Sequence, residues 1–226
     1  MMLCWTNGSV LSVALGQTSL SQGRYTWRHN QVLRQLAITL EGRRTAINAL
    51  PPPMPRPKTT PFLRSGQVPT KPSGRVETTL LDTARDWRMQ VDLDQRLIFP
   101  PEIITTSLRL DLVLWSASQK SVFIVELTVP WEAAVGEAYE RKRLKYSDIA
   151  AEAKQRGWHV QVLPVEVGCR GFVAMSTIKP LKRMGVREQA FRQSVKAISE
   201  AAERGSSWIW IKRKDPNWAA KHPIQG

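Results

Sequence analysis

Cysteine is scarce in this sequence, which contains two, Cys4 and Cys169. Two cysteines cannot build a disulfide framework, and no cysteine pairing typical of a zinc site is present. We therefore expect no zinc, and a reducing compartment fits the chain better than an oxidising one.

Long apolar runs are also missing. No stretch approaches the ~20 residues that span a bilayer. The start, MMLCWTNGSVLSVALGQ, lacks the basic region that opens a secretory signal. We expect a soluble chain that is not secreted, that resides in the nucleus or cytoplasm, and that has neither a membrane partner nor a small-molecule cofactor.

Acidic residues are few, because 19 Asp and Glu stand against 33 Lys and Arg, for a formal net charge of +14. This balance favours a polyanionic partner: DNA first, with RNA as the alternative, and an acidic membrane surface second. A basic surface that engages nothing is the competing interpretation. A hydrophobic fraction of 42% with nine Trp indicates a packed globular protein.

Composition divides the chain into five stretches. In order, they are a poorly specified N-terminus, a basic helical segment, a proline-rich basic linker, a folded domain and a tail: 1–22, 23–49, 50–75, 76–214 and 215–226. In the second stretch, apolar residues at three-to-four spacing predict a helix over 25–44 that Gly42 ends. Arg28 on this helix is a candidate phosphate contact.

The linker holds eight prolines and five basic residues but no acid. Its prolines exclude regular helix or sheet, so we expect a semi-extended segment. It is either a mere spacer or a strap along a phosphate backbone, in which case Arg56 and Lys58 bind nucleic acid.

Helical and strand patterns alternate in the folded domain. In order, we expect helix 77–87, strands 88–94, 107–115 and 121–129, helix 131–157, strand 158–167, helix 188–205 and a closing strand 206–214. This order predicts an α/β (α+β) fold with a mixed central sheet flanked by helices. Trp208 and Trp210 share one face of the closing strand, and core packing is favoured over base stacking for them.

Two acids interrupt neighbouring apolar strands, Asp111 in LRLDLVLW and Glu126 in VFIVELTV. Burying an ionised carboxylate is costly unless something pairs with it. If the strands pair, both acids project from the same face, which Thr128 shares. A hard divalent cation, Mg²⁺ or Mn²⁺, would resolve their repulsion and could activate water for attack on phosphorus.

The helix expected over 131–157 carries a second anomaly. Lys142 falls near the centre of its apolar stripe, one turn before Tyr146, and Lys145 lies on the flank of that stripe. An inward Lys needs a counter-anion, and the two strand acids are candidates. It could steady a phosphate, but a structural Lys–Glu pair or a Lys that reaches out to solvent explains the pattern equally.

Fourteen residues separate Asp111 from the Glu of ELTVPWE, and a helix with ERKRLKY follows. This arrangement resembles the PD-(D/E)XK restriction-enzyme-like endonucleases. Together with GRYTWRHNQVLRQL and PVEVGCRGF, it looks like the C-terminal nuclease region of site-specific non-LTR retrotransposon polyproteins, over about residues 22–214. The resemblance implies a restriction-endonuclease-like fold and divalent-metal-dependent nicking of DNA.

Position by position, the resemblance makes Asp111 and Glu126 metal ligands, with the Leu127 carbonyl as a third. Thr128 stands where the motif has Lys, so Lys142 or Lys145 would take over that role. Lys142 and Tyr146 also resemble a polar-plus-Tyr pair, four residues apart, on the corresponding helix of some relatives. Glu77 matches a further acid of some relatives, and Leu110 replaces the motif's Pro. The zinc knuckle that precedes this region in the family is missing, so the N-terminus looks like a truncated remnant and His29 like a helix-surface or capping residue.

Four further residues are candidate phosphate contacts near the C-terminal half: Arg170, Lys212, Arg213 and Lys214. Cys169 between two glycines is expected to pack as a small buried residue. Two functional hypotheses follow: a retrotransposon-derived, metal-dependent DNA endonuclease, or a nucleic-acid-binding remnant whose catalysis has decayed. A transposon reading frame without a selected role is the third.

Overall fold

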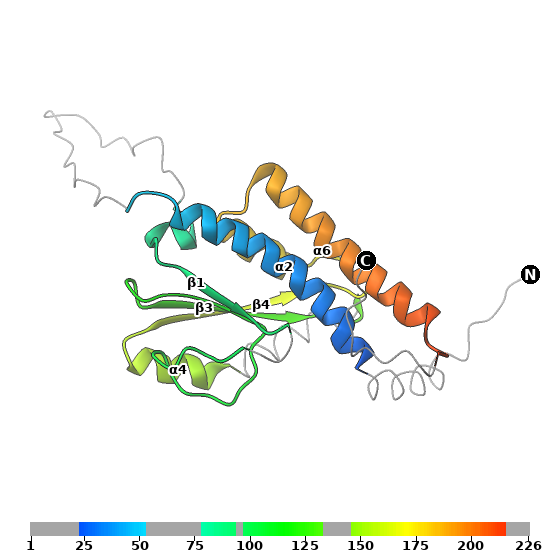
Figure 1. Ribbon diagram of the computed structural model, residues 1–226, viewed down its shortest axis with the longest axis horizontal. Coiled ribbons are helices and arrows are strands. Elements are labelled where there is room, and N and C mark those ends of the chain that lie inside the picture. Colours follow the sequence, from blue (N-terminus) through cyan, green and yellow to red (C-terminus); the bar gives the residue numbers. More distant parts are fainter. Residues whose placement is uncertain (1–22, 53–77, 94–96, 133–145, 216–226) are drawn as a thin grey trace, which may run out of the picture.

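The computed structural model describes residues 23–52, 78–93, 97–132 and 146–215. These residues form four strands, four α-helices and one short 3₁₀ helix. Figure 1 shows how they are arranged. In chain order they are α2 (Arg24–Asn48), η1 (Leu80–Thr83), β1 (Arg88–Val91), β2 (Leu112–Ser116), β3 (Ser121–Thr128), α4 (Ser147–Gln155), β4 (His159–Glu166), α5 (Met175–Arg183) and α6 (Glu188–Ile211).

The four strands form one mixed sheet in the order β1-β2-β3-β4. The pairs β1–β2 and β2–β3 are antiparallel, whereas β3–β4 is parallel. A parallel neighbour needs a crossover connection, and α4 lies in the stretch that makes it. The predicted mixed sheet flanked by helices is confirmed.

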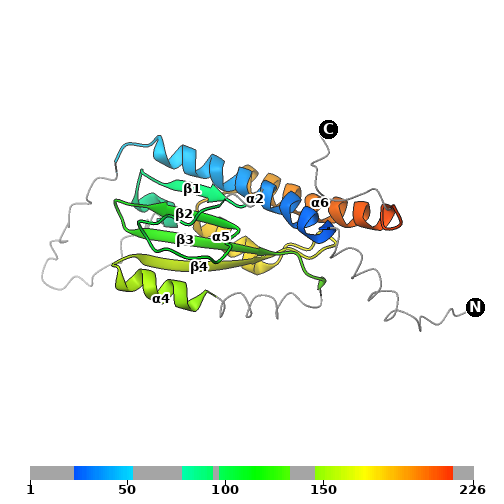
Figure 2. The ribbon, with the colours of Figure 1, turned by 60° about the horizontal axis from the view of Figure 1, so that its bottom comes forward.

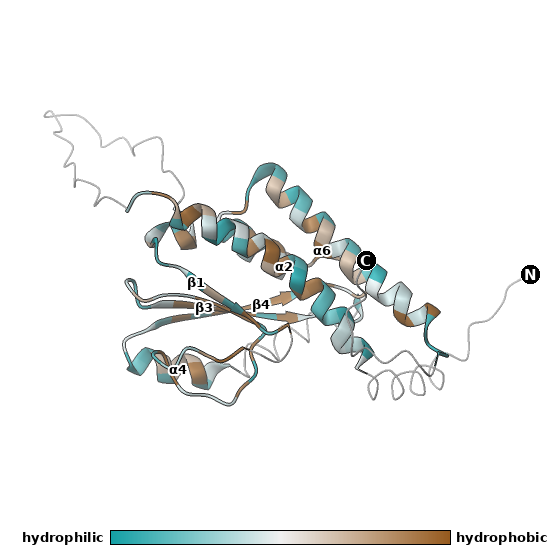
Figure 3. Cartoon of the chain, viewed as in Figure 1, coloured by the Kyte–Doolittle hydropathy of each residue, from teal (hydrophilic) through white to brown (hydrophobic). Residues whose placement is uncertain are grey.

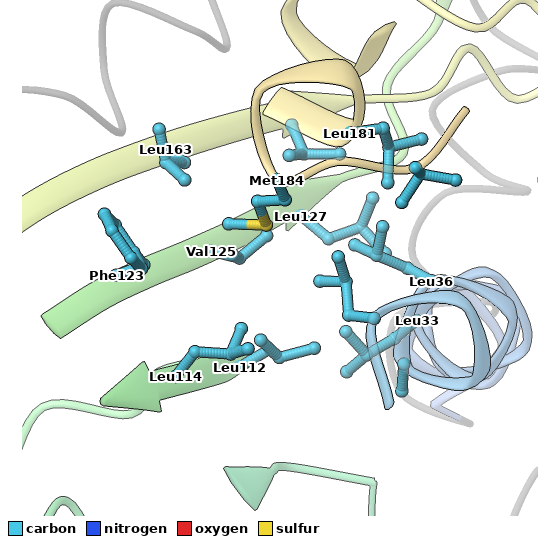
Figure 4. Packing of buried hydrophobic residues seen from close by; sticks show 14 of the residues in the cluster. Leu33, Leu36, Leu112, Leu114, Phe123, Val125, Leu127, Leu163, Leu181 and Met184 are labelled. Atoms are coloured by element: carbon cyan, nitrogen blue, oxygen red, sulfur yellow. The ribbon is translucent and has the colours of Figure 1, made fainter. Parts of the chain in front are cut away.

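Helices cover both faces of the sheet, which explains why β3 is apolar along nearly its whole length. Phe123, Val125 and Leu127 belong to one buried cluster with residues of α2, α5 and α6. Figure 4 shows part of this cluster, with Leu33 and Leu36 of α2 and Leu181 of α5. The alternate residues Val122 and Ile124 belong to a second cluster with Ile149 of α4 and with the segment 97–110. Figure 2 shows α4 lying beside β4, with α2 and α6 on the opposite side of the sheet.

Helix α2 packs on the sheet through the apolar stripe that the sequence predicts. Val32, Leu33, Leu36 and Leu40 are all buried. The prediction that Gly42 ends this helix is wrong, because α2 continues to Asn48 and buries Ile47. A glycine inside a helix costs about 1 kcal/mol, which is less than the ~1.5–3 kcal/mol gained by burying an aliphatic side chain.

The predicted closing strand 206–214 is also wrong, because α6 runs without interruption through it to Ile211. Gly205 does not end this helix but lies at its contact with α2, where an added Cβ would come within 2.8 Å of Arg28 Cγ. Trp208 and Trp210 are exposed and therefore do not pack in the core. Figure 3 shows hydrophobic residues near the C-terminal end of α6, whereas much of the rest of the helix is hydrophilic.

Smaller corrections concern element bounds. The helix expected over 77–87 is the four-residue 3₁₀ helix η1, and the strand expected over 107–115 begins at Leu112. Helix α5, which contains Pro180, was not predicted. Of the helix expected over 131–157, residues 133–145 lie outside the described residues, and the helix found in the described part is α4. Most of the linker 50–75 and both chain ends also lie outside the described residues. No helix among the described residues is long and apolar enough to cross a membrane.

Candidate active site

Asp111 and Glu126 lie side by side at one end of the sheet. The β2–β3 register pairs Leu112 with Val125, so Asp111, directly before β2, comes opposite Glu126. Each carboxylate accepts a backbone N–H from the other segment: Asp111 N–H donates to Glu126 Oε1 at 3.1 Å, and Leu127 N–H donates to Asp111 Oδ2 at 2.8 Å. These reciprocal bonds fix both acids on adjacent backbones.

Tyr146, at the start of α4, holds the second carboxylate from the other side. Its hydroxyl donates to Glu126 Oε2 at 2.8 Å. Burial first, and then the negative charge of Glu126, raise the pKa of Tyr146 far above its usual range. The phenol therefore keeps its proton and orients Glu126, whose side chain is 0% exposed. With both of its oxygens hydrogen-bonded, the burial of this acid is compensated.

His29 reaches the same site from α2, which corrects its assignment as a helix-surface or capping residue. Its Nε2 lies 3.4 Å from Asp111 Oδ2 and 3.3 Å from the Leu127 carbonyl oxygen. Its Nδ1 lies 3.3 Å from Asn30 Oδ1. The spacing could have revealed this placement, because His29 extends the buried Leu33–Leu36–Leu40 stripe by one turn.

Both ring nitrogens of His29 face oxygen acceptors, which favours the imidazolium. The amide of Asn30 is fixed in this orientation because its Nδ2 donates to the Leu93 carbonyl at 2.9 Å. Burial is the largest single influence and lowers the pKa of His29. The hydrogen bond and charge of Asp111, with the Asn30 and Leu127 contacts, outweigh it, so the pKa is raised above 6.5 overall.

This raised pKa predicts that His29 stabilises the fold most at low pH. Between its unfolded and folded pKa values the folded state binds more protons, so the contribution is complete below about pH 6.5 and is lost as pH rises through the folded pKa. We expect urea unfolding in EDTA to show that His29→Gln lowers the free energy of unfolding most at acidic pH. A deficit that stays constant or grows toward alkaline pH would contradict the assignment.

A cavity of about 460 Å³ opens over these residues. Its lining comes from α2, from the residue after β1, from the segment before β2, from the end of β3 and from the start of α4. The lining residues are Tyr25, Thr26, Arg28, His29, Asn30, Asp92, Arg109, Asp111, Glu126, Leu127, Thr128, Val129 and Tyr146. Arg109 Nη2 lies 2.7 Å from Asp92 Oδ2. Thr128, on the same sheet face as Glu126, has a buried hydroxyl with no hydrogen-bond partner among the described residues.

A larger hollow of about 750 Å³ lies between α2 and α6, away from the two carboxylates. Its lining includes Arg43 and Asp82, which pair with each other at 3.4 Å. We place the chemistry in the smaller cavity, because reactive sites need convergent polar groups rather than volume.

The donor set of the smaller cavity fits a hard divalent cation. Two carboxylates and the Leu127 carbonyl offer only oxygen, and each carboxylate has about four acceptor positions, of which the bonds above use a part. Within the described ranges, no three His, Cys, Asp or Glu side chains form a metal site by themselves. Mg²⁺ does not require such a cluster, because it commonly takes one or two carboxylates, with water and substrate phosphate completing its shell.

Several predicted site residues cannot be placed. Lys142 and Lys145 lie in 133–145, and Glu77, Arg56 and Lys58 lie in 53–77, all outside the described residues.

Arg28 lines the cavity and also contacts the end of β3 and helix α6. Its guanidinium donates to the Val129 carbonyl at 2.9 Å and to Ser206 Oγ of α6 at 3.0 Å, and it lies over the Tyr25 ring. Burial is the largest influence on its pKa and lowers it. Arg28 therefore joins α2, β3 and α6 in addition to lining the cavity.

The other predicted phosphate contacts lie at the same end of the molecule. Arg170 stacks over the Trp131 ring, and Arg213 over the Trp210 ring at 4.0 Å. Lys212 pairs with Asp215 at 3.2 Å, and Lys214 is exposed.

Cys169 packs as a buried residue, as predicted. Burial also raises the pKa of its thiol, which disfavours the reactive thiolate.

No protein-family model and no curated protein matches the chain.

Proposed function

We propose that this chain is a divalent-metal-dependent DNA endonuclease that hydrolyses phosphodiester bonds and nicks DNA. One observation carries the proposal: Asp111 and Glu126 lie side by side, each fixed by the backbone N–H of the other segment, beside the Leu127 carbonyl and in an open cavity. Two neighbouring carboxylates repel each other and so do not stabilise the fold by themselves, whereas their combined charge suits the binding of a cation.

Asp111, Glu126 and the Leu127 carbonyl would hold Mg²⁺ or Mn²⁺. When bound, such an ion supplies an activated water and stabilises charge that develops on a phosphate. The chain's own residues position the ligands: Tyr146 holds Glu126, while Leu127 N–H and His29 hold Asp111. His29 also brings a positive charge to the cavity, which would attract a phosphate electrostatically while its two N–H groups stay on protein acceptors.

DNA is the proposed substrate because of the charge balance, with 33 Lys and Arg against 19 Asp and Glu. A mixed sheet with paired carboxylates at one strand end also agrees with the restriction-endonuclease-like fold. The resemblance to the nuclease region of non-LTR retrotransposon polyproteins supports the same reading. A DNA substrate would place the chain in the nucleus, with the cytoplasm as the alternative.

The proposal is tested by nicking of supercoiled plasmid. We expect relaxed circles in Mg²⁺ or Mn²⁺ and none in EDTA, because chelation removes the ion and leaves the fold intact. Circular dichroism in EDTA provides the control for folding. A well-folded chain that leaves the plasmid supercoiled with either ion would refute the proposed activity.

A nucleic-acid-binding protein without cleavage is the second candidate. The observation that favours it is Thr128, a neutral residue in the cavity where the resembling nucleases carry Lys. Such a protein would retain plasmid in a gel shift, with binding that weakens steeply as salt rises, but would leave the plasmid uncut.

A further inference from the structure

We propose that Trp131, two residues beyond Val129 of the cavity lining, and Arg170 form a preorganised platform on which an unpaired base of single-stranded DNA stacks. This inference rests on the proposed function in taking DNA as the ligand, and it deepens that function by naming the state of the strand at the site.

Trp131 is exposed in a way that needs a reason. Its side chain is 61% exposed, although a buried tryptophan contributes one of the largest apolar areas of any residue. The Arg170 guanidinium lies 5.8 Å from the ring centroid, within the range of a cation–π contact. A flat apolar ring beside a cation matches a nucleotide, which combines a π face with a phosphate.

The segment that carries Arg170 is fixed to the segment that carries Trp131. Glu132 Oε1 accepts the Arg170 backbone N–H at 2.7 Å, and Cys169 N–H donates to the Pro130 carbonyl at 2.8 Å. Gly168 allows this approach, because an added Cβ would lie 2.8 Å from Glu132 Oε1.

The same segment is also tied to α6. Ser206 Oγ donates to the Cys169 carbonyl, and Ser199 Oγ donates to the Gly171 carbonyl at 2.7 Å. Gly171 has a φ of +95°, a conformation that other residues rarely adopt. A surface ordered before binding loses less entropy when a ligand arrives, which favours affinity.

The platform is continuous with the cavity. Val129, two residues before Trp131, lines the cavity, and its carbonyl accepts the Arg28 bond. Arg28 also reaches Ser206, whose hydroxyl bonds the Cys169 carbonyl beside Arg170. The platform therefore adjoins the cavity through Val129 and Arg28, and a strand that enters the cavity has the Trp131 ring within reach.

An unpaired base is the occupant that this geometry favours. In a duplex, neighbouring base pairs cover the base faces, so a protein ring can stack on a base only where the strand is single or the base is extruded. The basic charge of the chain is complementary to such a strand and unfavourable for a basic protein partner.

The test measures binding of a labelled oligothymidylate by fluorescence anisotropy in EDTA, with the full chain. We expect Trp131→Ala to weaken binding roughly 5- to 100-fold, the effect of losing one stacked base. An abasic oligonucleotide of equal length has the same phosphates, so its affinity should hardly change. Trp131→Phe should retain most of the affinity, and Arg170→Ala should weaken the binding of both oligonucleotides.

Two results would overturn the platform: equal losses for the thymidylate and abasic oligonucleotides, or no loss for either. Circular dichroism shows whether each variant is folded. If the alanine variant is not, the unmodified chain decides, because the platform requires it to bind the thymidylate more tightly than the abasic oligonucleotide, and equal affinities would overturn it. Oligonucleotide binding is measured in EDTA, so it does not depend on whether the chain cleaves DNA. A platform effect without plasmid nicking refutes the nuclease alone, whereas nicking with unchanged oligonucleotide binding refutes the platform alone.

Discussion

We expect Asp111→Asn to lower plasmid nicking by about 100-fold or more, because even residues that merely support metal ligands contribute 10- to 100-fold. Asparagine keeps an acceptor for the Leu127 N–H, which now bonds Asp111 Oδ2 at 2.8 Å. It removes the negative charge that a cation would need. The measurement is the initial rate of relaxed-circle formation in Mg²⁺.

The matched control is Asp148→Asn, an exposed acid of α4 that does not line the cavity. It removes the same charge and should leave the rate unchanged. Both variants should unfold at urea concentrations close to that of the unmodified chain and should retain plasmid in a gel shift. If Asp111→Asn nicks at the unmodified rate, Asp111 is not a metal ligand and the active-site assignment fails.

Trp87→Ala should give the largest loss of stability, about 3–5 kcal/mol in the free energy of unfolding. Trp87 is 1% exposed, its ring stacks on Phe123 at 5.3 Å, and its Nε1 donates to the Leu81 carbonyl at 2.9 Å. Alanine leaves a cavity and an unpaired carbonyl in the core between η1 and the sheet. Urea unfolding followed by circular dichroism measures the difference.

Trp210→Ala provides the comparison, because its ring on α6 is 60% exposed and its loss should change stability by no more than about 1 kcal/mol. Trp87 directly precedes β1, whose first residue, Arg88, pairs with Trp115 near the last residue of β2. Asp111 lies at the other end of β2, so Trp87 is far along the sheet from the two carboxylates. Nicking by folded Trp87→Ala should therefore be unaffected at low temperature. Equal stability losses in the two variants would mean that the core is placed wrongly.

Local pattern identified the parts of the fold whose periodicity is unambiguous. The apolar run of β3 and the stripe of α2 each admit one interpretation, and both are found. Residues 206–211 allow two interpretations. Trp208 and Trp210 are spaced by two as in a strand, but the segment also continues the preceding helix, and the structure shows the helix. The low helix propensity of Gly42 and Gly205 favours an end to α2 and α6, respectively, at these residues. Both helices continue because α2 and α6 pack along their lengths, and this packing outweighs the propensity of one glycine.

The sequence by itself determined that two carboxylates meet. A short turn joins two apolar strands, the side-chain period of a strand is two, and positions 111 and 126 consequently fall opposite one another. It also determined the excess of positive charge.

Only the tertiary structure decided what surrounds these acids. His29 reaches Leu127 across 98 positions of sequence, and Arg28 reaches Ser206 across 178. Contacts at such separations depend on how a helix docks on the sheet, and local periodicity shows which face is buried but not what that face meets. The carboxylate pair is thus a property of two adjacent strands, whereas the cavity and its rim are a property of helix packing.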